Sequence, residues 1–251
     1  MLKVDTLHFS YGHSAPVLNG ASLALEQGQI GILLGKNGCG KTTLFKNILG
    51  IEKPQSGSIT FDGENLLKMN RRERARRIAY VPQHIHFGDL TVMDSILMGR
   101  ISRFGLQAGV EDYEAVEKLL VDMGLTEFAA RSAEALSGGE KQKIAIARAM
   151  AQEPKLMVFD EPTGNLDIAN EQLIIQEAKQ LAREKHISIL SSLHDLNQAL
   201  AFGDKFFFMK KGVVKYAGGK EIFTKEVIKD IFDADVDIRQ IDGRTVILQN
   251  L

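Results

Sequence analysis

Residues Gly35–Thr42 read Gly-Lys-Asn-Gly-Cys-Gly-Lys-Thr and fit the spacing G-x-x-x-x-G-K-[ST]. Three glycines within six positions let the backbone curl so that successive N–H groups point into one anion-binding concavity. Lys41 offers a positive charge to the β- and γ-phosphates of a nucleotide, and Thr42 offers a hydroxyl group to Mg²⁺. The spacing therefore predicts a phosphate-binding loop; the alternative is a simple glycine-rich turn.

The residues on either side of this loop support the prediction. Ile30–Leu34 is a short apolar run typical of a buried strand, and Thr43–Leu49 has a helical pattern that ends at Gly50. The N-terminal end of that helix would add a positive dipole to the anion site. Because Cys39 lies within the loop, we expect alkylation of its thiol to block nucleotide binding and ATP to protect it. The nucleotide-binding residues expected here are Gly35, Asn37, Gly38, Cys39, Gly40, Lys41, Thr42 and Thr43.

Length and composition exclude several classes of protein. The 251 residues are enough for one large domain or for a core with a small subdomain. A formal net charge of −1 gives no indication of a nucleic-acid surface. Cys39 is the only cysteine, which excludes disulfides within the chain and favours a reducing compartment. We find no signal-peptide pattern and no apolar run near the roughly 20 residues that cross a bilayer, so a role at a membrane would need a membrane partner.

The order of the expected elements indicates an α/β fold. Three early strands, over 2–9, 21–26 and 57–61, suggest an antiparallel β patch. Helical patterns follow over 91–99, 111–123 and 140–151. Strands and helices then alternate, which favours a parallel sheet with covering helices; they lie at 155–160, 168–184, 187–192 and 195–202. The chain is expected to end with a hairpin over 206–216, a helical stretch over 220–232 and a hairpin at 242–243.

The arginine-rich run Arg71–Arg77 invites a functional interpretation. It could contact phosphate or acidic lipid, but a solvated helix face is the simpler explanation. No role in binding is therefore assigned to these arginines.

A pair of acidic residues follows the apolar run 156–159. Parallel α/β sheets bind ligands at the carboxyl ends of their strands, so Asp160 is expected beside the phosphate-binding loop. It would hold Mg²⁺ directly or through water. Glu161 would point toward the γ-phosphate, where a base must polarise the attacking water. The alternative is an acidic pair that merely ends a strand.

With these motifs in order along the chain, the sequence resembles an ATP-binding cassette (ABC) ATPase over nearly its whole length. Residues 136–140 read Leu-Ser-Gly-Gly-Glu, like the family's signature, just before a helical pattern. The family most often has Gln at the fifth position, so Glu140 is a departure. Ser137 and Glu140 also fit an S-x-x-E capping box, in which Gln would serve the same purpose. The departure is therefore expected to be mild.

The resemblance implies a homodimer. In the family, two subunits pair head to tail, and each signature closes on ATP held by the other subunit. The free N–H groups at the start of the signature helix would provide that second anion site. The residues expected to bind the partner's ATP are Ser137, Gly138, Gly139 and Glu140.

Four further positions match the family. Gln83, after a strand, resembles the glutamine that senses Mg²⁺ and the γ-phosphate. Asp167, in the run Gly164-Asn165-Leu166-Asp167, resembles the D-loop that crosses the dimer interface, although it could also be a helix N-cap. His194 resembles the switch histidine that contacts the γ-phosphate, and Tyr11 the aromatic residue that stacks on adenine. The plainer alternatives are a polar residue after a strand, a structural histidine and an exposed loop aromatic.

The resemblance also implies a domain arrangement. A β subdomain and a RecA-like core would comprise about 1–85 and 153–220, a helical signature subdomain about 86–152, and a C-terminal tail about 221–251. Lys41, Gln83, Glu161 and His194 would be catalytic, and Thr42, Gln83 and Asp160 would hold Mg²⁺.

The function implied is the ATP-hydrolysing motor of a membrane importer, on the cytoplasmic face of a bacterial or archaeal membrane. The segment 91–105 and its surroundings resemble importers of iron–siderophore, haem or cobalamin, and Gln83–Gly105 would contact the membrane permease. An extracytoplasmic substrate-binding protein would be an indirect partner. The alternatives are an importer of another cargo, such as molybdate or zinc, or a soluble ABC ATPase of repair, translation or cluster assembly.

Overall fold

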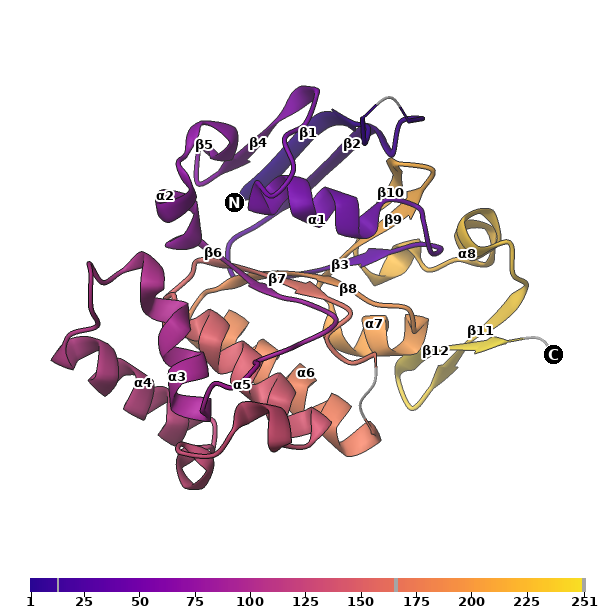
Figure 1. Cartoon of the computed structure of the whole chain (residues 1–251). Coiled ribbons are helices and arrows are strands. Elements are labelled where there is room, and N and C mark those ends of the chain that lie inside the picture. Colours follow the sequence, from indigo (N-terminus) through magenta and orange to yellow (C-terminus); the bar gives the residue numbers. More distant parts are fainter. Residues whose placement is uncertain (13, 165–166, 250–251) are drawn as a thin grey trace. The chain divides into compact units, whose positions relative to one another are not determined.

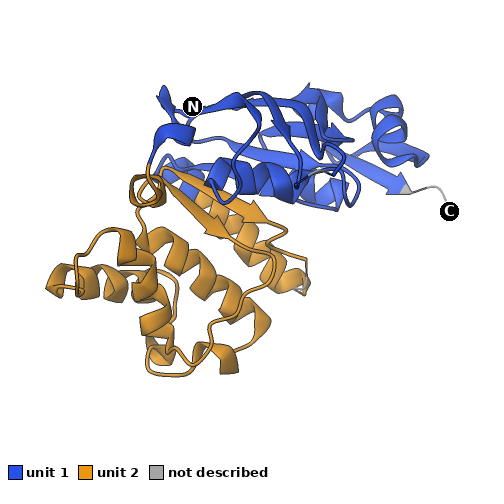
Figure 2. Ribbon diagram, turned by 45° about the horizontal axis from the view of Figure 1, so that its top comes forward, with its two compact units in different colours: residues 1–69, 181–251 blue, residues 70–180 orange. Residues whose placement is uncertain are grey.

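The computed structural model describes residues 1–12, 14–164 and 167–249 (Figure 1). The chain divides into two compact units (Figure 2). Unit 1 comprises Met1–Met69 and Leu181–Leu251, and unit 2 comprises Asn70–Gln180. The subdomain boundaries expected from the sequence stay a prediction.

Unit 1 contains the expected antiparallel patch. Its strand order is β2-β1-β4-β5, with β1 Leu2–Phe9, β2 Leu18–Leu25, β4 Ser56–Phe61 and β5 Glu64–Asn65. Alternate residues of β1 are buried, but the register shifts between Val4 and Leu7, where Thr6 has a φ of 47°. This β-bulge adds one residue, which returns the later apolar side chains to the buried face.

Unit 1 also contains parallel strands. Strand β3, Ile30–Leu34, is buried throughout and pairs in parallel with β8, Ser188–Ser192, and β9, Lys205–Lys210. Strand β10, Val213–Gly218, returns antiparallel to β9. Strands covered on both faces tend to be apolar along their length, which is consistent with the unbroken apolar run in β3. Helices α1, Lys41–Leu49, and α7, Leu196–Phe202, follow β3 and β8 along the chain.

The C-terminal tail differs from its prediction in one respect. The helical stretch expected over 220–232 is interrupted: a 3-10 turn η5, Lys220–Ile222, precedes helix α8, Lys225–Phe232. η5 ends with its C-cap at Phe223, and Thr224 caps α8, because its hydroxyl accepts a hydrogen bond from the N–H of Val227 at 3.3 Å. The last hairpin consists of β11, Val236–Ile241, and β12, Arg244–Gln249. The amide of Asn197 on α7 bonds both backbone groups of Ile247, at 3.0 and 2.8 Å, which holds this hairpin.

Unit 2 combines two parallel strands with helices. The strands are β6, Ile78–Val81, and β7, Leu156–Asp160. The helices are α2 Arg71–Ala75, α3 Val92–Leu97, α4 Val110–Asp122, α5 Gly138–Ala151 and α6 Ile168–Glu184, the last of which ends within unit 1. The short 3-10 segments of the chain's middle are η1 Leu66–Lys68, η2 Met98–Ser102, η3 Thr126–Phe128 and η4 Ala133–Ala135. Apolar residues at helical spacing, including Ile96, Val116 and Ile144, are fully buried between α3, α4 and α5.

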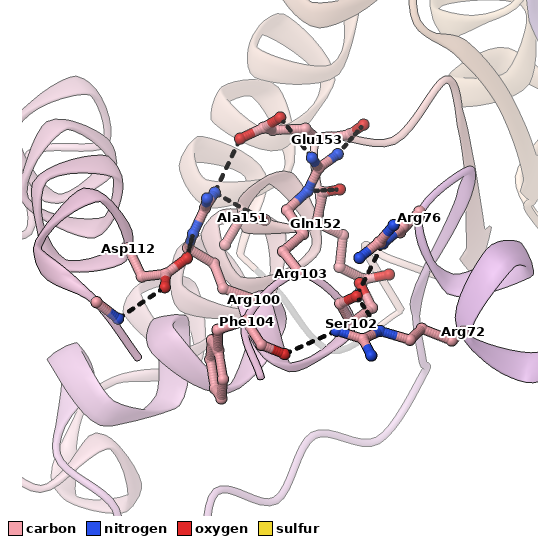
Figure 3. A network of polar contacts seen from close by, with 11 residues as sticks. Arg72, Arg76, Arg100, Ser102, Arg103, Phe104, Asp112, Ala151, Gln152 and Glu153 are labelled. Atoms are coloured by element: carbon pink, nitrogen blue, oxygen red, sulfur yellow. Dashed lines mark hydrogen bonds and ion pairs between the residues drawn. The ribbon is translucent and has the colours of Figure 1, made fainter. Parts of the chain in front are cut away.

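A network of arginines braces the segment that follows α3 (Figure 3). Arg100 in η2 is only 8% exposed and bonds the carboxylates of Asp112 and Glu153 at 2.7 and 2.8 Å. It also donates to the carbonyl of Ala151, at the end of α5, at 3.2 Å. Cations at the carboxyl end of a helix satisfy its last carbonyls and complement its dipole. The segment is thereby fastened to both α4 and α5.

Two arginines of the charged run have specific contacts. Arg72 and Arg76 both donate to the carbonyl oxygen of Ser102, at 2.9 and 2.8 Å, and Arg72 also donates to that of Phe104 (Figure 3). Arg72 and Arg76 are nevertheless exposed and no residue of α2 is buried, so the interpretation of Arg71–Arg77 as a solvated helix face agrees with the structure, which adds specific partners for these two side chains. Charge density in a sequence does not reveal which backbone carbonyls lie within reach.

Candidate functional site

The predicted phosphate-binding loop lies in unit 1, between β3 and α1, the strand and helix that the sequence indicated. Gly35 has a φ of 156°, and a Cβ atom there would lie 2.3 Å from the carbonyl oxygen of Met209. Gly40 precedes α1 with a φ of 111°, and a Cβ atom there would lie 3.1 Å from the carbonyl oxygen of Val17. Both positions therefore require glycine, for backbone conformation and for space.

The loop already surrounds a positive charge. The side chain of Lys41 is buried, and its Nζ donates to the carbonyls of Gly35 and Lys36 at 2.7 and 3.4 Å. The ammonium group is therefore held inside the curl of the loop. Thr42 is exposed at the start of α1, where its hydroxyl is accessible to a ligand. Charge, hydroxyl and helix N-terminus thus lie together, as phosphate binding requires.

Tyr11 lies beside the first turn of α1. Its hydroxyl is 3.4 Å from that of Thr43, and its ring packs edge-on against Phe9, with centroids 4.8 Å apart. The Nζ atom of Lys46 lies 5.9 Å from the centre of the ring. The structure therefore brings the expected adenine-stacking residue to the expected loop, and its role in stacking remains a proposal.

Cys39 is less accessible than its place in the loop suggests. The residue is 7% exposed, and its sulfur lies 2.8 Å from where a Cβ atom on Gly35 would be. Burial raises the pKa of the thiol, against a smaller opposite effect of the positive charge on Lys41. A raised pKa leaves less of the reactive thiolate at neutral pH.

We therefore expect iodoacetamide to alkylate folded Cys39 at least about 10-fold more slowly at pH 7.5 than in the urea-unfolded chain. The rate should rise with pH beyond the ordinary pKa of a thiol. Mass spectrometry checks the rate, and ATP should slow it further because the nucleotide holds the loop closed. Equal rates in folded and unfolded protein would contradict the burial of Cys39.

His194 lies in unit 1, two residues beyond the end of β8, and is exposed. It borders a cavity of about 470 Å³ between the start of α7 and the tail. The residues that line this cavity are His194, Asp195, Leu196, Asn197, Ile228, Phe232, Ala234, Asp235, Val236 and Ile247. The predicted switch histidine is thus at an accessible strand end, and its contact with phosphate remains a proposal.

Asp160 ends β7 in unit 2 and is 4% exposed. The hydroxyl of Tyr80, on the neighbouring strand β6, donates to its carboxylate at 3.5 Å. Burial, together with the negative charge of Asp160, raises the pKa of Tyr80 to about 12. Tyr80 therefore stays protonated and available as a donor. Tyr80 was not among the residues predicted from the sequence, although its place on the strand before Gln83 was a usable signal.

Glu161 and Gln83 are in direct contact. Nε2 of Gln83 donates to Oε2 of Glu161 at 2.5 Å. Glu161 has a φ of 51°, a left-handed conformation that is uncommon outside glycine and that clusters at functional sites. The turn after β7 thereby directs the two carboxylates of Asp160 and Glu161 differently, one buried and one partly exposed. Unit 2 thus brings together three of the predicted site residues.

The signature residues begin helix α5 in unit 2, and the predicted capping box is present. The backbone N–H and the hydroxyl of Ser137 both donate to Oε2 of Glu140, at 2.8 and 2.6 Å. In return the N–H of Glu140 donates to the hydroxyl oxygen of Ser137 at 3.4 Å. The bonds from Ser137 lower the pKa of the Glu140 carboxyl.

The predicted D-loop residues Asn165 and Leu166 lie outside the described residues. Asp167 caps α6: its two carboxylate oxygens accept from the backbone and the side-chain amide of Asn170, at 2.9 and 3.0 Å. The capped Asn170 lies against the signature. A Cβ atom on Gly139 would be 2.2 Å from its Oδ1 atom. A side chain at position 139 would therefore require Asn170 to move, and Asn170 was not among the residues predicted from the sequence.

We expect Gly139→Ala to reduce ATPase activity at least about 10-fold, because the new methyl group displaces Asn170 or the start of α5. The double variant Gly139→Ala/Asn170→Ala should recover most of the activity, since the smaller side chain leaves room for the methyl group. Steady-state ATPase assays of the two single variants and the double variant check this. A double variant as inactive as Gly139→Ala would contradict the steric explanation.

Two of the predicted magnesium ligands, one in each unit, have the chemistry that this ion prefers. Mg²⁺ prefers oxygen ligands and keeps several waters while it binds one or two protein groups and substrate phosphates. The exposed hydroxyl of Thr42 and the buried carboxylate of Asp160 are ligands of this kind. Within the described residues, no cluster of three or more His, Cys, Asp or Glu side chains forms an all-protein metal site. None of the described helices is long and apolar enough to span a membrane.

Comparisons with known proteins agree on one family. A family model described as ABC transporter matches residues 18–164. An uncharacterised ABC transporter ATP-binding protein of Methanocaldococcus jannaschii is 36% identical over 99% of this chain and 97% of its own length. The iron(3+)-hydroxamate import ATP-binding protein of Bacillus subtilis is 34% identical over 94% and 89%. A phosphonates import ATP-binding protein of a Synechococcus strain is 33% identical over 92% and 90%.

Solved structures show the same fold. A metal-chelate type ABC transporter, solved in an inward-facing conformation, matches with a TM-score of 0.86 and 30% identity, over 100% of this chain and 97% of that chain. A dimeric ATP-binding cassette in a post-hydrolysis state, bound to ADP and phosphate, matches with a TM-score of 0.77 and 26% identity, over 87% and 98%. The predicted α/β fold, with a parallel sheet, an antiparallel β patch and a helical part, is confirmed.

Proposed function

The chain belongs to the ABC transporter ATPases, and from this premise we propose that it is the ATP-hydrolysing subunit of a membrane importer. The observation that carries the proposal is the Asp160–Glu161 turn. It offers a buried carboxylate on Asp160 and a partly exposed carboxylate on Glu161, whose backbone is left-handed and whose side chain accepts from Gln83. A buried carboxylate suits a metal ion, and an accessible one suits a base for water.

The proposed reaction is in-line attack of water on the γ-phosphate of ATP. Lys41 and the loop N–H groups would stabilise the charge that develops on the phosphate oxygens. Thr42 and Asp160 would hold Mg²⁺, which neutralises phosphate charge when bound. Glu161 would accept a proton from water, with Gln83 fixing the orientation of its carboxylate and His194 contacting the γ-phosphate. Tyr11 would stack on adenine.

We propose that two copies of the chain act together. The relative that binds ADP and phosphate is dimeric, which supports this arrangement. Each signature, Ser137–Glu140, would then act on ATP held by the partner subunit. Asp167 would act there as well, because it bonds Asn170, which lies against Gly139. Hydrolysis would depend on closure of the dimer, and loss of the γ-phosphate would favour opening.

A membrane permease is proposed to dock on the segment Gln83–Gly105. Met98 and Ile101 are about half exposed in η2, and Leu106 just beyond is fully exposed. Exposed apolar side chains on a braced backbone are typical of an interaction surface. The arginines of Figure 3 hold the backbone of this segment in place. An extracytoplasmic binding protein would reach this chain only through the permease, at the cytoplasmic face of the membrane.

The proposed cargo is a metal chelate such as iron–siderophore, haem or cobalamin. Relatives named for iron-hydroxamate and enterobactin transport support this class, whereas those named for phosphonates favour a different cargo. Molybdate and zinc also stay open, as does a soluble ATPase of repair, translation or cluster assembly.

Purification of the tagged chain from native membranes in mild detergent tests the proposal. We expect a multi-helix permease to co-purify and the complex to hydrolyse Mg-ATP. Titration with ferric siderophores, haem, cobalamin and a phosphonate, each with its binding protein, would then identify the cargo by stimulation of ATPase activity. A soluble partner instead of a permease would contradict the importer.

A further inference from the structure

The signature turn carries a negative charge where a phosphate would approach it. Glu140 is the third residue of α5, and one oxygen of its carboxylate, Oε2, accepts from both the N–H and the hydroxyl of Ser137. The distances, 2.8 and 2.6 Å, are those of charge-assisted hydrogen bonds. Both donors of Ser137 are thus directed at a carboxylate of the same chain.

The surroundings keep this carboxylate ionised. The bonds from Ser137 lower the pKa of Glu140, and the nearby cations Arg131 and Lys143 act in the same direction. The positive end of α5 favours an anion at this position as well. Glu140 is therefore an anion bound at the helix terminus that the proposed function assigns to an incoming phosphate.

A glutamine at this position would preserve the geometry without the charge. Its amide oxygen could accept both hydrogen bonds from Ser137, as the capping-box pattern allows Glu or Gln. What differs is a full negative charge on the group that accepts from the Ser137 hydroxyl, which the proposed dimer would direct at the γ-phosphate. The departure from the common family signature is thus electrostatic rather than conformational.

We propose that the Glu140 carboxylate competes with the γ-phosphate of the partner's ATP for Ser137 and thereby raises the ATP concentration needed to close the dimer. The inference rests on the proposed head-to-tail dimer and deepens it. Closure must displace the carboxylate from the hydroxyl of Ser137 before that hydroxyl can bond phosphate. Glu140 thus sets the affinity of the signature for ATP without touching the phosphate-binding loop of its own chain.

The chain offers a matched control. Helix α2 begins with the same arrangement: the N–H of Asn70 donates to Oε2 of Glu73 at 3.1 Å, and the N–H of Glu73 donates to Oδ1 of Asn70 at 2.9 Å. Glu73→Gln therefore makes the same chemical change in a capping box that the proposed site does not use.

The experiment compares Glu140→Gln and Glu73→Gln, each in a Glu161→Gln background that binds ATP without hydrolysing it. Multi-angle light scattering measures the dimer fraction against Mg-ATP concentration at low salt, with Mg-ADP as the ligand that lacks the γ-phosphate. We expect Glu140→Gln to lower the half-maximal ATP concentration about 5–10-fold and Glu73→Gln to leave it unchanged. The difference should shrink as salt rises, because added ions screen the repulsion.

An unchanged or higher ATP requirement for Glu140→Gln would overturn the inference. An equal effect of Glu140→Gln on the affinity of the isolated monomer for a fluorescent ATP analogue would also overturn the inference, since the charge would then act on nucleotide bound to its own chain. If the Glu161→Gln parent and both derivatives stayed monomeric with saturating ATP, the proposed dimer itself would fail and the inference with it. If the protein dimerised with the same ATP dependence before and after Glu140→Gln, the inference would be refuted and the proposed dimer would stand.

Discussion

Glu161→Gln is expected to lower the turnover number for ATP hydrolysis about 10²–10⁴-fold while leaving ATP affinity within about threefold, because only the general base is lost. The amide retains the shape of the carboxylate and can still accept from Nε2 of Gln83. Without hydrolysis, ATP should remain bound and the dimer should accumulate. Single-turnover assays and light scattering with Mg-ATP check the two effects.

Glu153→Gln provides the matched control for this variant. Glu153 is also a glutamate in a left-handed conformation, with a φ of 50° against 51° for Glu161, but it pairs with Arg100 and Arg103. Glu153→Gln likewise removes one negative charge from a residue with a left-handed backbone. It should leave the turnover number within about twofold of the wild-type value. Normal hydrolysis by Glu161→Gln would refute Glu161 as the base.

Arg100→Met is expected to lower the free energy of unfolding by about 3 kcal/mol, at the lower end of what breaking a buried ion pair costs. The side chains of Arg100 and Asp112 are 10% and 11% exposed, so loss of the cation leaves a charge with little access to water. Arg103→Met should cost only about 1 kcal/mol, since Arg103 is 27% exposed and its partner Glu153 is 56% exposed. Urea unfolding at pH 7 checks both values.

Two further measurements separate the charge effect from lost packing. Arg100→Met/Asp112→Asn should recover part of the stability, because no buried charge is left and Asn still accepts from the N–H of Gly109. The Arg100 guanidinium holds the pKa of Asp112 below its ordinary value. The stabilisation is therefore complete at neutral pH and decreases as the pH falls below about 4, toward the lowered pKa. A stability difference between wild type and Arg100→Met that is independent of pH down to the acid transition would contradict the ion-pair explanation.

Much of the fold could be predicted from local pattern. The strand Ile30–Leu34 and the helix Ile168–Glu184 have the bounds that periodicity indicated. Errors arose where a single side chain decided the local structure. The hydroxyl of Thr224 caps α8 after a 3-10 turn. The helical spacing of apolar residues continues across this interruption and therefore does not reveal it.

The candidate site was predictable where a motif requires backbone conformation. Glycines at 35 and 40 and the capping box at Ser137 follow from spacing, because the chain near each residue determines its geometry. Contacts between distant residues were not predictable in this way. Tyr80 beside Asp160 and Asn170 against Gly139 depend on which strands and helices pack together.

By itself, the sequence determined the glycine-rich loop before α1, the acidic end of β7, the capping box that starts α5 and the order of elements, since each depends on residues within one or two helical turns. Only the tertiary structure decided which carbonyls Arg72 and Arg76 bond, that Asn170 lies against Gly139, and that Glu140 accepts from both donors of Ser137. The physical reason is the short range of hydrogen bonds and steric contact. A few ångströms decide whether a side chain bonds a neighbour, and folding, not chain position, sets that distance.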